Sequence, residues 1–500
     1  MTRRVLLLAL GLLLALPSLA GAAPPWTKRP RPKGLSYGGT FWVLGAPDLR
    51  MEGPYEDRFQ LRAGLDARVT YKFAPTASFQ LAAKARYELR VGDRVEADLL
   101  VDLGDSWFQF RVKKLTVRAG RETLKWGSNA LLSPLDRLNP VDLTRAMGGA
   151  GLDDPKIPVL AVRATLNLSP VALEAVWLPV FQPQRIAFYG RDFAVFRPGM
   201  LEESIPEMVP GTGVGVADDA LATAGDRLVD ALVDLDPYAR DGLQSYLVAD
   251  LPEEFPWHGD FGGRVGFTGR GVDLDGYVLW HILDRPEVHL SDAIREPLLE
   301  NRLPDGAELT QLTNPGAELV NVRYRRALMA GMDATFALGD FVISAEGAFD
   351  SRAVHYRKTL EPYLSPDVRY AVEVRYQAGS TFGLTLAAAH HIILRPAADT
   401  LMERPHNVTV GLVAVLRLLR DRLQILASAS YAPMWGDLYI HPRITVELQD
   451  RVTAVFGVQL FESFRPDVEP GLDSFLATTG GPVGYFRGND YAYGMVQLAF

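Results

Sequence analysis

The sequence predicts an all-β fold: a transmembrane, antiparallel, up-and-down β-barrel of about 18 strands, with long extracellular loops that carry short helices. Residues 59–73 place an apolar side chain at every second position, and residues 77–91 repeat the pattern after a short turn. A strand has a side-chain period of two, so each run has one apolar face. Soluble strands are usually about five or six residues long. Runs of this length can cross a bilayer when they are tilted.

The alternation continues to the end of the chain, and short connections alternate with long ones such as 123–157, 181–260 and 284–319. This rhythm is typical of a barrel with tight periplasmic turns and long outer loops. The segment 94–112 changes parity at Gly104-Asp105, where we expect a bulge within one strand. Sixteen strands is the alternative, if 35–45 is not in the wall or a pair is misread. The expected strands are 35–45, 58–73, 77–91, 94–112, 115–122, 158–168, 171–180, 261–269, 272–283, 320–338, 340–353, 367–378, 381–394, 407–418, 421–432, 438–448, 450–461 and 490–500.

The first 22 residues have the pattern of a cleaved secretory signal peptide. Arg3 and Arg4 precede an apolar run over 5–16, and Ala20-Gly21-Ala22 provides a small-residue cleavage site. The apolar run is shorter than the roughly 20 residues that a membrane anchor needs. We expect 23–34 to be a periplasmic linker and 35–500 to be one barrel domain. The absence of Cys excludes disulfides, thiolate metal sites and a cysteine lipid anchor.

The last strand ends on an aromatic residue. Val496, Leu498 and Phe500 lie on one apolar face. This ending resembles the C-terminal assembly signal of bacterial outer-membrane β-barrels. The resemblance implies the outer membrane of a Gram-negative bacterium as the location. It implies outer-membrane lipid and the barrel-assembly machinery as partners.

The polar face of the early strands is rich in cations, which would line the lumen if the apolar face meets lipid. One interpretation is an electropositive wall that selects anionic or polar solutes. The other is a set of internal ion pairs that brace the barrel, because buried charges are normally paired. The candidate lumen residues are Arg62, Arg68, Lys84, Arg86, Arg118 and Arg163.

The loop 181–260 is too long to be a simple connector. It is strongly acidic between 202 and 254, and its apolar spacing over 221–235 predicts an amphipathic helix. Such a helix must bury its apolar stripe. It could fold into the barrel mouth as a plug or pack on neighbouring loops as a cap.

A local motif leaves the fifth expected strand and continues in the next loop. Gly120-Arg121 is followed by Trp126-Gly127, and then by Asn139-Pro140 and Asp142. This pattern resembles a Gram-negative outer-membrane barrel family with a domain of unknown function, whose members are regarded as porin-like channels. We interpret it first as a device that anchors a loop at the rim. The glycines would permit close backbone approach, and Trp126 would suit the outer membrane interface.

No enzymatic motif occurs in the context that it requires. None of the eight His lies in a hydrolase or metalloprotease frame, and we expect neither a metal nor another cofactor. His390 and His391 are adjacent in a strand and point to opposite faces. The net charge of -8 argues against a nucleic-acid partner. The sequence favours a passive channel for small polar or amphipathic solutes of unknown identity. A non-transport scaffold with partner-binding acidic loops, and a carrier of hydrophobic molecules, are the alternatives.

Overall fold

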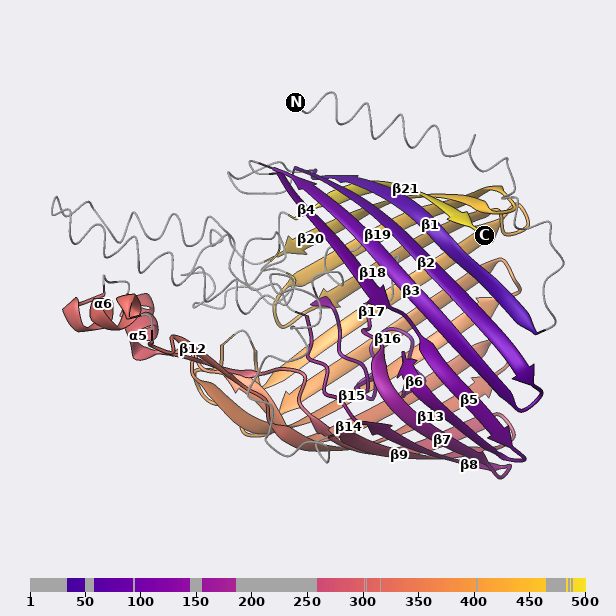
Figure 1. Ribbon diagram of the computed structural model, residues 1–500, viewed down its shortest axis with the longest axis horizontal. Coiled ribbons are helices and arrows are strands. Elements are labelled where there is room, and N and C mark those ends of the chain that lie inside the picture. Colours follow the sequence, from indigo (N-terminus) through magenta and orange to yellow (C-terminus); the bar gives the residue numbers. More distant parts are fainter. Residues whose placement is uncertain are drawn as a thin grey trace.

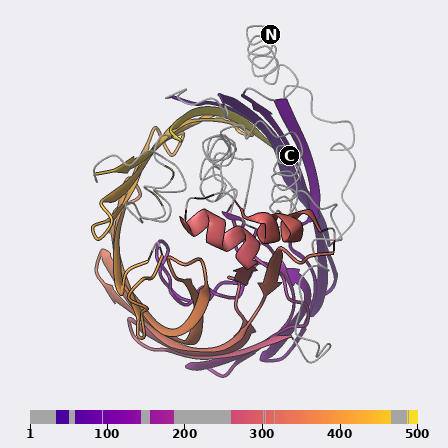
Figure 2. The same ribbon diagram turned by 90° about the vertical axis from the view of Figure 1, so that its left-hand side faces the viewer.

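The computed structural model describes residues 34–49, 58–92, 95–143, 155–185, 259–300, 302, 304–314, 316–401, 403–464, 483, 486 and 489–500. The strands form one closed antiparallel ring (Figures 1 and 2). The ring closes where the first strand, β1 (Leu35–Pro47), pairs with the last, β21 (Tyr491–Ala499). Outside the ring, β11 (Glu287–Leu290) and β12 (Val320–Arg323) pair only with each other.

The wall has eighteen strands, as predicted. β4 (Val95–Leu103) and β5 (Ser106–Val112) both pair with β3 (Ala77–Val91), so they are two halves of one strand interrupted at Gly104 and Asp105. The other wall strands are β2 (Phe59–Ala74), β6 (Leu115–Glu122), β7 (Val159–Asn167), β8 (Val171–Leu178), β9 (Asp260–Thr268), β10 (Val272–Ile282), β13 (Arg326–Leu338), β14 (Phe341–Tyr356), β15 (Pro362–Ala378), β16 (Phe382–Ile393), β17 (His406–Leu418), β18 (Leu423–Ala432), β19 (Asp437–Gln449) and β20 (Val452–Ser463).

Two expected strand starts are wrong. β15 begins at Pro362 and not at 367, because Tyr356 to Ala353 of β14 pair with Pro362 to Ser365. The sequence predicts a single strand over 320–338, but Val320–Arg323 pairs with β11 and the wall resumes only at Arg326. Two short helices, α5 (Asp292–Glu300) and α6 (Gly306–Thr313), lie between the strands of this extra hairpin. They project beyond the barrel at the end that carries the long connections (Figure 1). No helix in the described part of the chain is long and apolar enough to span a membrane.

The outward face is an apolar band between two sets of aromatic side chains. Leu65, Leu81 and Leu386, which lie within the band, are 41–52% exposed, whereas Ala371 on the inward face is 1% exposed. Aromatic residues on both sides of such a band mark the two membrane interfaces. Near the short turns they are Phe73, Phe79, Phe108 and Phe341, and near the long connections they are Trp177, Phe261, Trp280 and Tyr370.

The inward side is mixed and partly filled. Near the long connections, β1, β20 and β21 contribute an apolar and aromatic cluster that includes Leu44, Phe461 and Tyr493, against which Val483 and Phe486 pack. Toward the short turns, the inward side chains of Arg264 and Arg375 keep 37% and 39% of their surface exposed. Side chains that face away from lipid and still meet solvent indicate a hollow lumen in that half of the barrel.

Candidate functional site, a loop folded into the lumen

The predicted basic wall is largely neutralised by carboxylates from neighbouring strands. Arg62 donates to Glu88 at 3.0 Å, and the Nη2 of Arg86 lies 2.9 Å from both carboxylate oxygens of Asp66. Arg86 also lies over the ring of Trp42, with its guanidinium carbon 5.2 Å from the ring centroid.

A similar arrangement occurs on β6 and β7. Arg118 and Arg163 share the buried carboxylate of Glu122, at 3.0 and 2.9 Å. These four cations therefore brace the wall. In the described residues Arg68 and Lys84 have no ion pair.

The loop between β6 and β7 enters the lumen directly after the first half of the motif. Gly120 has φ +142°, and a Cβ there would lie 2.3 Å from the Ser106 carbonyl oxygen, so only glycine allows β5 to approach this closely. Arg121 makes a two-pronged ion pair with Asp102, at 2.6 and 3.0 Å. The Asp105 carboxylate accepts from both the backbone and the hydroxyl of Thr123. The exit of the chain from the wall is thereby fixed.

The tip of this loop is held by two buried glutamates of the opposite wall. The amides of Ser128 and Asn129 donate to Glu346 on β14. The next two amides, at 130 and 131, donate to Glu373 on β15 at 2.8 and 3.0 Å. Glu346 and Glu373 are 3% and 0% exposed. A buried carboxylate is costly unless hydrogen bonds satisfy it, and charge-assisted bonds are among the strongest available.

Gly127 makes this approach possible. Its φ is +84°, and a Cβ would lie 2.8 Å from the Glu346 carboxylate. The hydroxyl of Ser133 also donates to Glu346. We call residues 123–143 the constriction loop, because it leaves one wall and is bonded to the other.

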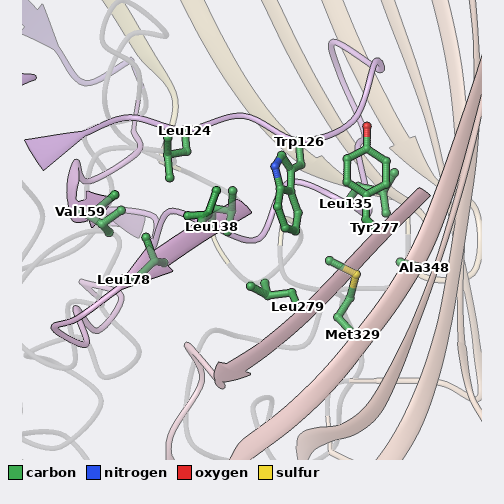
Figure 3. Close-up of a cluster of buried hydrophobic side chains, with 12 residues drawn as sticks. Leu124, Trp126, Leu135, Leu138, Val159, Leu178, Tyr277, Leu279, Met329 and Ala348 are labelled. Atoms are coloured by element: carbon green, nitrogen blue, oxygen red, sulfur yellow. The ribbon is translucent and has the colours of Figure 1, made fainter. Parts of the chain in front are cut away.

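Trp126 lies inside the barrel, so the expectation that it sits at the outer membrane interface is wrong. It is 1% exposed, its Nε1 donates to Glu174 at 2.9 Å, and its ring lies 5.3 Å from that of Tyr277. Figure 3 shows Leu135 and Leu138 from the constriction loop beside Trp126, facing wall residues such as Leu279. The chain turns inward before Trp126, and this turn carries the ring to the lumen side.

The second half of the motif closes the base of the loop. Asn139 accepts from the Leu124 amide at 2.7 Å, and its own amide donates to the carbonyls of Glu122 and Ile157. Asp142 forms a parallel bridge and an ion pair with Arg185. Pro140 accepts from the Ile157 amide at 2.9 Å. The motif therefore anchors a loop, as expected, but it does so inside the lumen and not at the outer rim.

A cavity of about 110 Å³ lies beside the constriction loop at the end with the long connections. Its lining includes the cations Arg137 and Arg352 together with Asp284 and Asp350. The Nε2 of His281 also belongs to this wall, is buried and has no hydrogen-bond partner within the described residues. Burial raises the pKa of Asp284 to about 7, although Arg137 nearby acts to lower it. The cavity can therefore take a small polar solute, and its charge balance changes near neutral pH.

Several functional residues could not be found from the sequence. Glu346 and Glu373 lie on strands of alternating pattern, like any other lumen residue. They are more than 200 positions away from the constriction loop in the sequence, and only closure of the ring brings them next to it. The helical pattern over 221–235, and most of the loop 181–260, lie outside the described residues. The part of the chain that is described contains no group of three or more His, Asp or Glu that could hold a metal ion.

Comparison with known proteins gives one family match. A family model described as "Protein of unknown function (DUF1302)" matches residues 68–193, which is less than half of the chain but includes the constriction loop. No curated protein matches.

Similar solved structures are porins. Pseudomonas putida OprB at high pH has TM-score 0.40 and 9% identity, with 94% of each chain covered. Salmonella typhi OmpF in complex with daunomycin has TM-score 0.39 and 8% identity, with 93% of this chain and 97% of that chain covered. A mutant Rhodopseudomonas blastica porin has TM-score 0.36 and 11% identity, with 93% and 100% covered. At this level of similarity, the description of the fold rests on the strand pairing itself.

Proposed function

We propose that this chain is an outer-membrane channel for passive uptake of small polar or amphipathic solutes. The observation that carries the proposal is the constriction loop: it crosses a closed barrel, is bonded to both walls, and leaves solvent-exposed lumen side chains toward the short turns. Loops that narrow a water-filled barrel select solutes by size and charge. Both charged and aromatic groups face the interior, which suits solutes with a polar and an apolar part.

The proposed location follows from the outward apolar band and from the two ends of the sequence. We infer export through cleavage of residues 1–22 and insertion into the outer membrane of a Gram-negative bacterium. Phe500 is the last residue of the seam: it exchanges backbone hydrogen bonds with Gly39 at 3.0 Å in both directions. A role for Val496, Leu498 and Phe500 in recognition by the assembly machinery is part of the same proposal.

The test is a comparison of solute entry and ion current. Purified protein is placed in liposomes for a swelling panel of sugars, amino acids and short carboxylates, and in planar bilayers for single-channel recording. We expect stable open steps, and swelling that falls as solute size increases. Heat-unfolded protein in the same lipid is the control. A silent bilayer with no swelling would overturn the channel and favour the partner-binding scaffold.

A further inference from the structure

Within the described residues, one strand of the wall has an edge that no other strand pairs. β3 pairs with β4 along all nine residues of β4, from Val91↔Val95 to Ala83↔Leu103. On the side that faces β6, only the β5 half of this interrupted strand is paired. Its pairing with β6 runs from Ser106↔Arg121 to Val112↔Leu115. Among the residues that the structure describes, no strand pairs with the second edge of β4.

The free edge exists because β6 is short. β6 ends at Glu122, where the chain enters the lumen as the constriction loop, and β7 begins only at Val159. The strand is interrupted at Gly104 and Asp105. There the Gly104 amide donates to the Ala82 carbonyl at 3.0 Å, and this bond fixes the end of β4 against β3. The free edge therefore results from the same feature that builds the constriction.

An open sheet edge is not stable against hydrocarbon, because lipid tails cannot bond its N–H and C=O groups. Such an edge must face water or a polar molecule. Leu99 and Val101, outward on β4, are 70% and 69% exposed, as is Met332 on the paired strand β13 at 68%. Leu65, which lies in the same register row as Val101 through Ala85, is 41% exposed.

Behind this edge lies a cavity of about 40 Å³. Its lining is mixed: it includes the apolar Leu100, Ile157 and Pro158, the cations Lys84, Arg86, Lys156 and Arg185, and the carboxylates Asp102 and Asp142. A single water needs about 10–15 Å³ by this measure. The cavity therefore has room for a head group the size of a carboxylate, while an attached chain would have to extend outside it.

Lys84 is one of the cations that line this cavity. Its two facing residues in the register are Asp66 and Asp102. These carboxylates are bonded to Arg86 and Arg121, respectively. Within the described residues Lys84 has no ion pair of its own.

We propose that the opening beside β4 binds an amphipathic solute that has one apolar chain and a carboxylate head, and that it connects the membrane with the lumen. The carboxylate pairs with Lys84, and the chain lies against Leu99, Val101 and Ile157. This inference deepens the proposed function by naming a solute class and a sideways route. Passage of small polar solutes along the barrel axis does not depend on it.

The binding test uses a C16 carboxylate carrying a photoreactive diazirine in its chain, with the protein in nanodiscs. We expect label on 95–103 and 155–158. Lys84→Gln should weaken labelling about tenfold, because one charge-assisted bond is lost. The matched control, Arg68→Gln, removes another inward cation that has no ion pair within the described residues, and should leave labelling unchanged. The same probe with a trimethylammonium head should label these segments poorly.

Two results would overturn the proposal. One is labelling that is spread evenly around the outer wall, competed equally by a diacyl anionic lipid and unaffected by Lys84→Gln, which is the behaviour of annular lipid. The other is slow hydrogen exchange along 95–103, equal to that of β3, which would show that another segment of the chain covers the edge. Neither result alters the axial conductance of polar solutes, so failure here is separable from failure of the channel itself.

Discussion

The wall from β13 to β20 and the wall from β4 to β9 meet the same membrane in different ways. The strands from β13 to β20 have 10–17 residues each, and backbone pairing with neighbours on both sides satisfies them. Around β6 to β8 the strands have only eight or nine residues, and after β6 side-chain carboxylates accept from the loop amides of Thr123 and Ser128. Pairing within the wall stops where β6 ends and the chain enters the lumen. The constriction loop, the free edge of β4 and the cavity behind it all belong to the short-strand sector.

The largest expected effect is a difference in stability between two outward positions of the same register row. Leu65 lies on a strand that is paired on both sides, and Val101 lies on the strand with the free edge. Leu65→Arg puts a charge on a paired, lipid-facing strand and should destabilise the barrel by about 2–4 kcal/mol. Val101→Arg makes the same change beside the opening, where the guanidinium can reach water, and should cost less than about 1 kcal/mol. Urea unfolding from lipid vesicles measures both. Equal costs would show that β4 is as enclosed as β2.

A second comparison concerns the backbone at the point where the chain leaves the wall. Gly120→Ala forces a Cβ into the Ser106 carbonyl at a positive φ and should cost about 1–3 kcal/mol. Gly276 lies on β10, which pairs with a strand on each side. A Cβ added at Gly276 would meet nothing within 4 Å, so Gly276→Ala should change the free energy of unfolding by less than about 0.5 kcal/mol. Urea unfolding from lipid vesicles measures both changes, and the folded fraction on heat-modifiable gels gives a second measurement. A tolerant Gly120 would mean that close approach of β5 is not required for the loop to turn inward.

The smallest expected effect is a pH dependence in the cavity beside the constriction loop. The pKa of Asp284 is about 7, so its carboxylate is charged above that pH and neutral below it. Lowering the pH from 8 to 6 therefore removes a negative charge and should increase anion preference, by no more than about twofold because salt screens the site. Reversal potentials at low salt measure the change. Asp284→Asn should start from the low-pH value and lose most of the shift. A shift that persists unchanged in Asp284→Asn would show that another titrating group carries it.

The fold could be predicted closely because a lipid-facing strand must alternate along its whole length. The strand over 94–112 was identified as one interrupted strand, since splitting it would break the alternation of short and long connections, and the pairing of β4 and β5 with β3 confirms this. The extra hairpin was missed because Val320–Arg323 has strand-like residues and lies only two positions from β13.

The site was less accessible to sequence analysis. The motif at 120–142 identified the loop, but not its direction, because Trp126 is equally compatible with a membrane interface and a buried cluster. The buried position of Trp126 depends on Glu174 and Tyr277, which are remote in sequence. The pairing of the lumen cations depends on register, which sets Arg62 opposite Glu88 and places Arg86 beside Asp66. Alternation alone specifies which face a residue occupies, but not its cross-strand partner.

The most direct test of the central claim is to release the constriction loop from the far wall and measure conductance. The double variant Glu346→Ala and Glu373→Ala removes the acceptors of four loop amides but cuts no strand. Glu447→Ala, which removes an exposed carboxylate on β19, is the matched control. In planar bilayers we expect a larger single-channel conductance and weaker size discrimination for the double variant, with the control equal to wild type. If the double variant folds but keeps the conductance and the solute range of the wild type, the claim that this loop narrows the channel is contradicted.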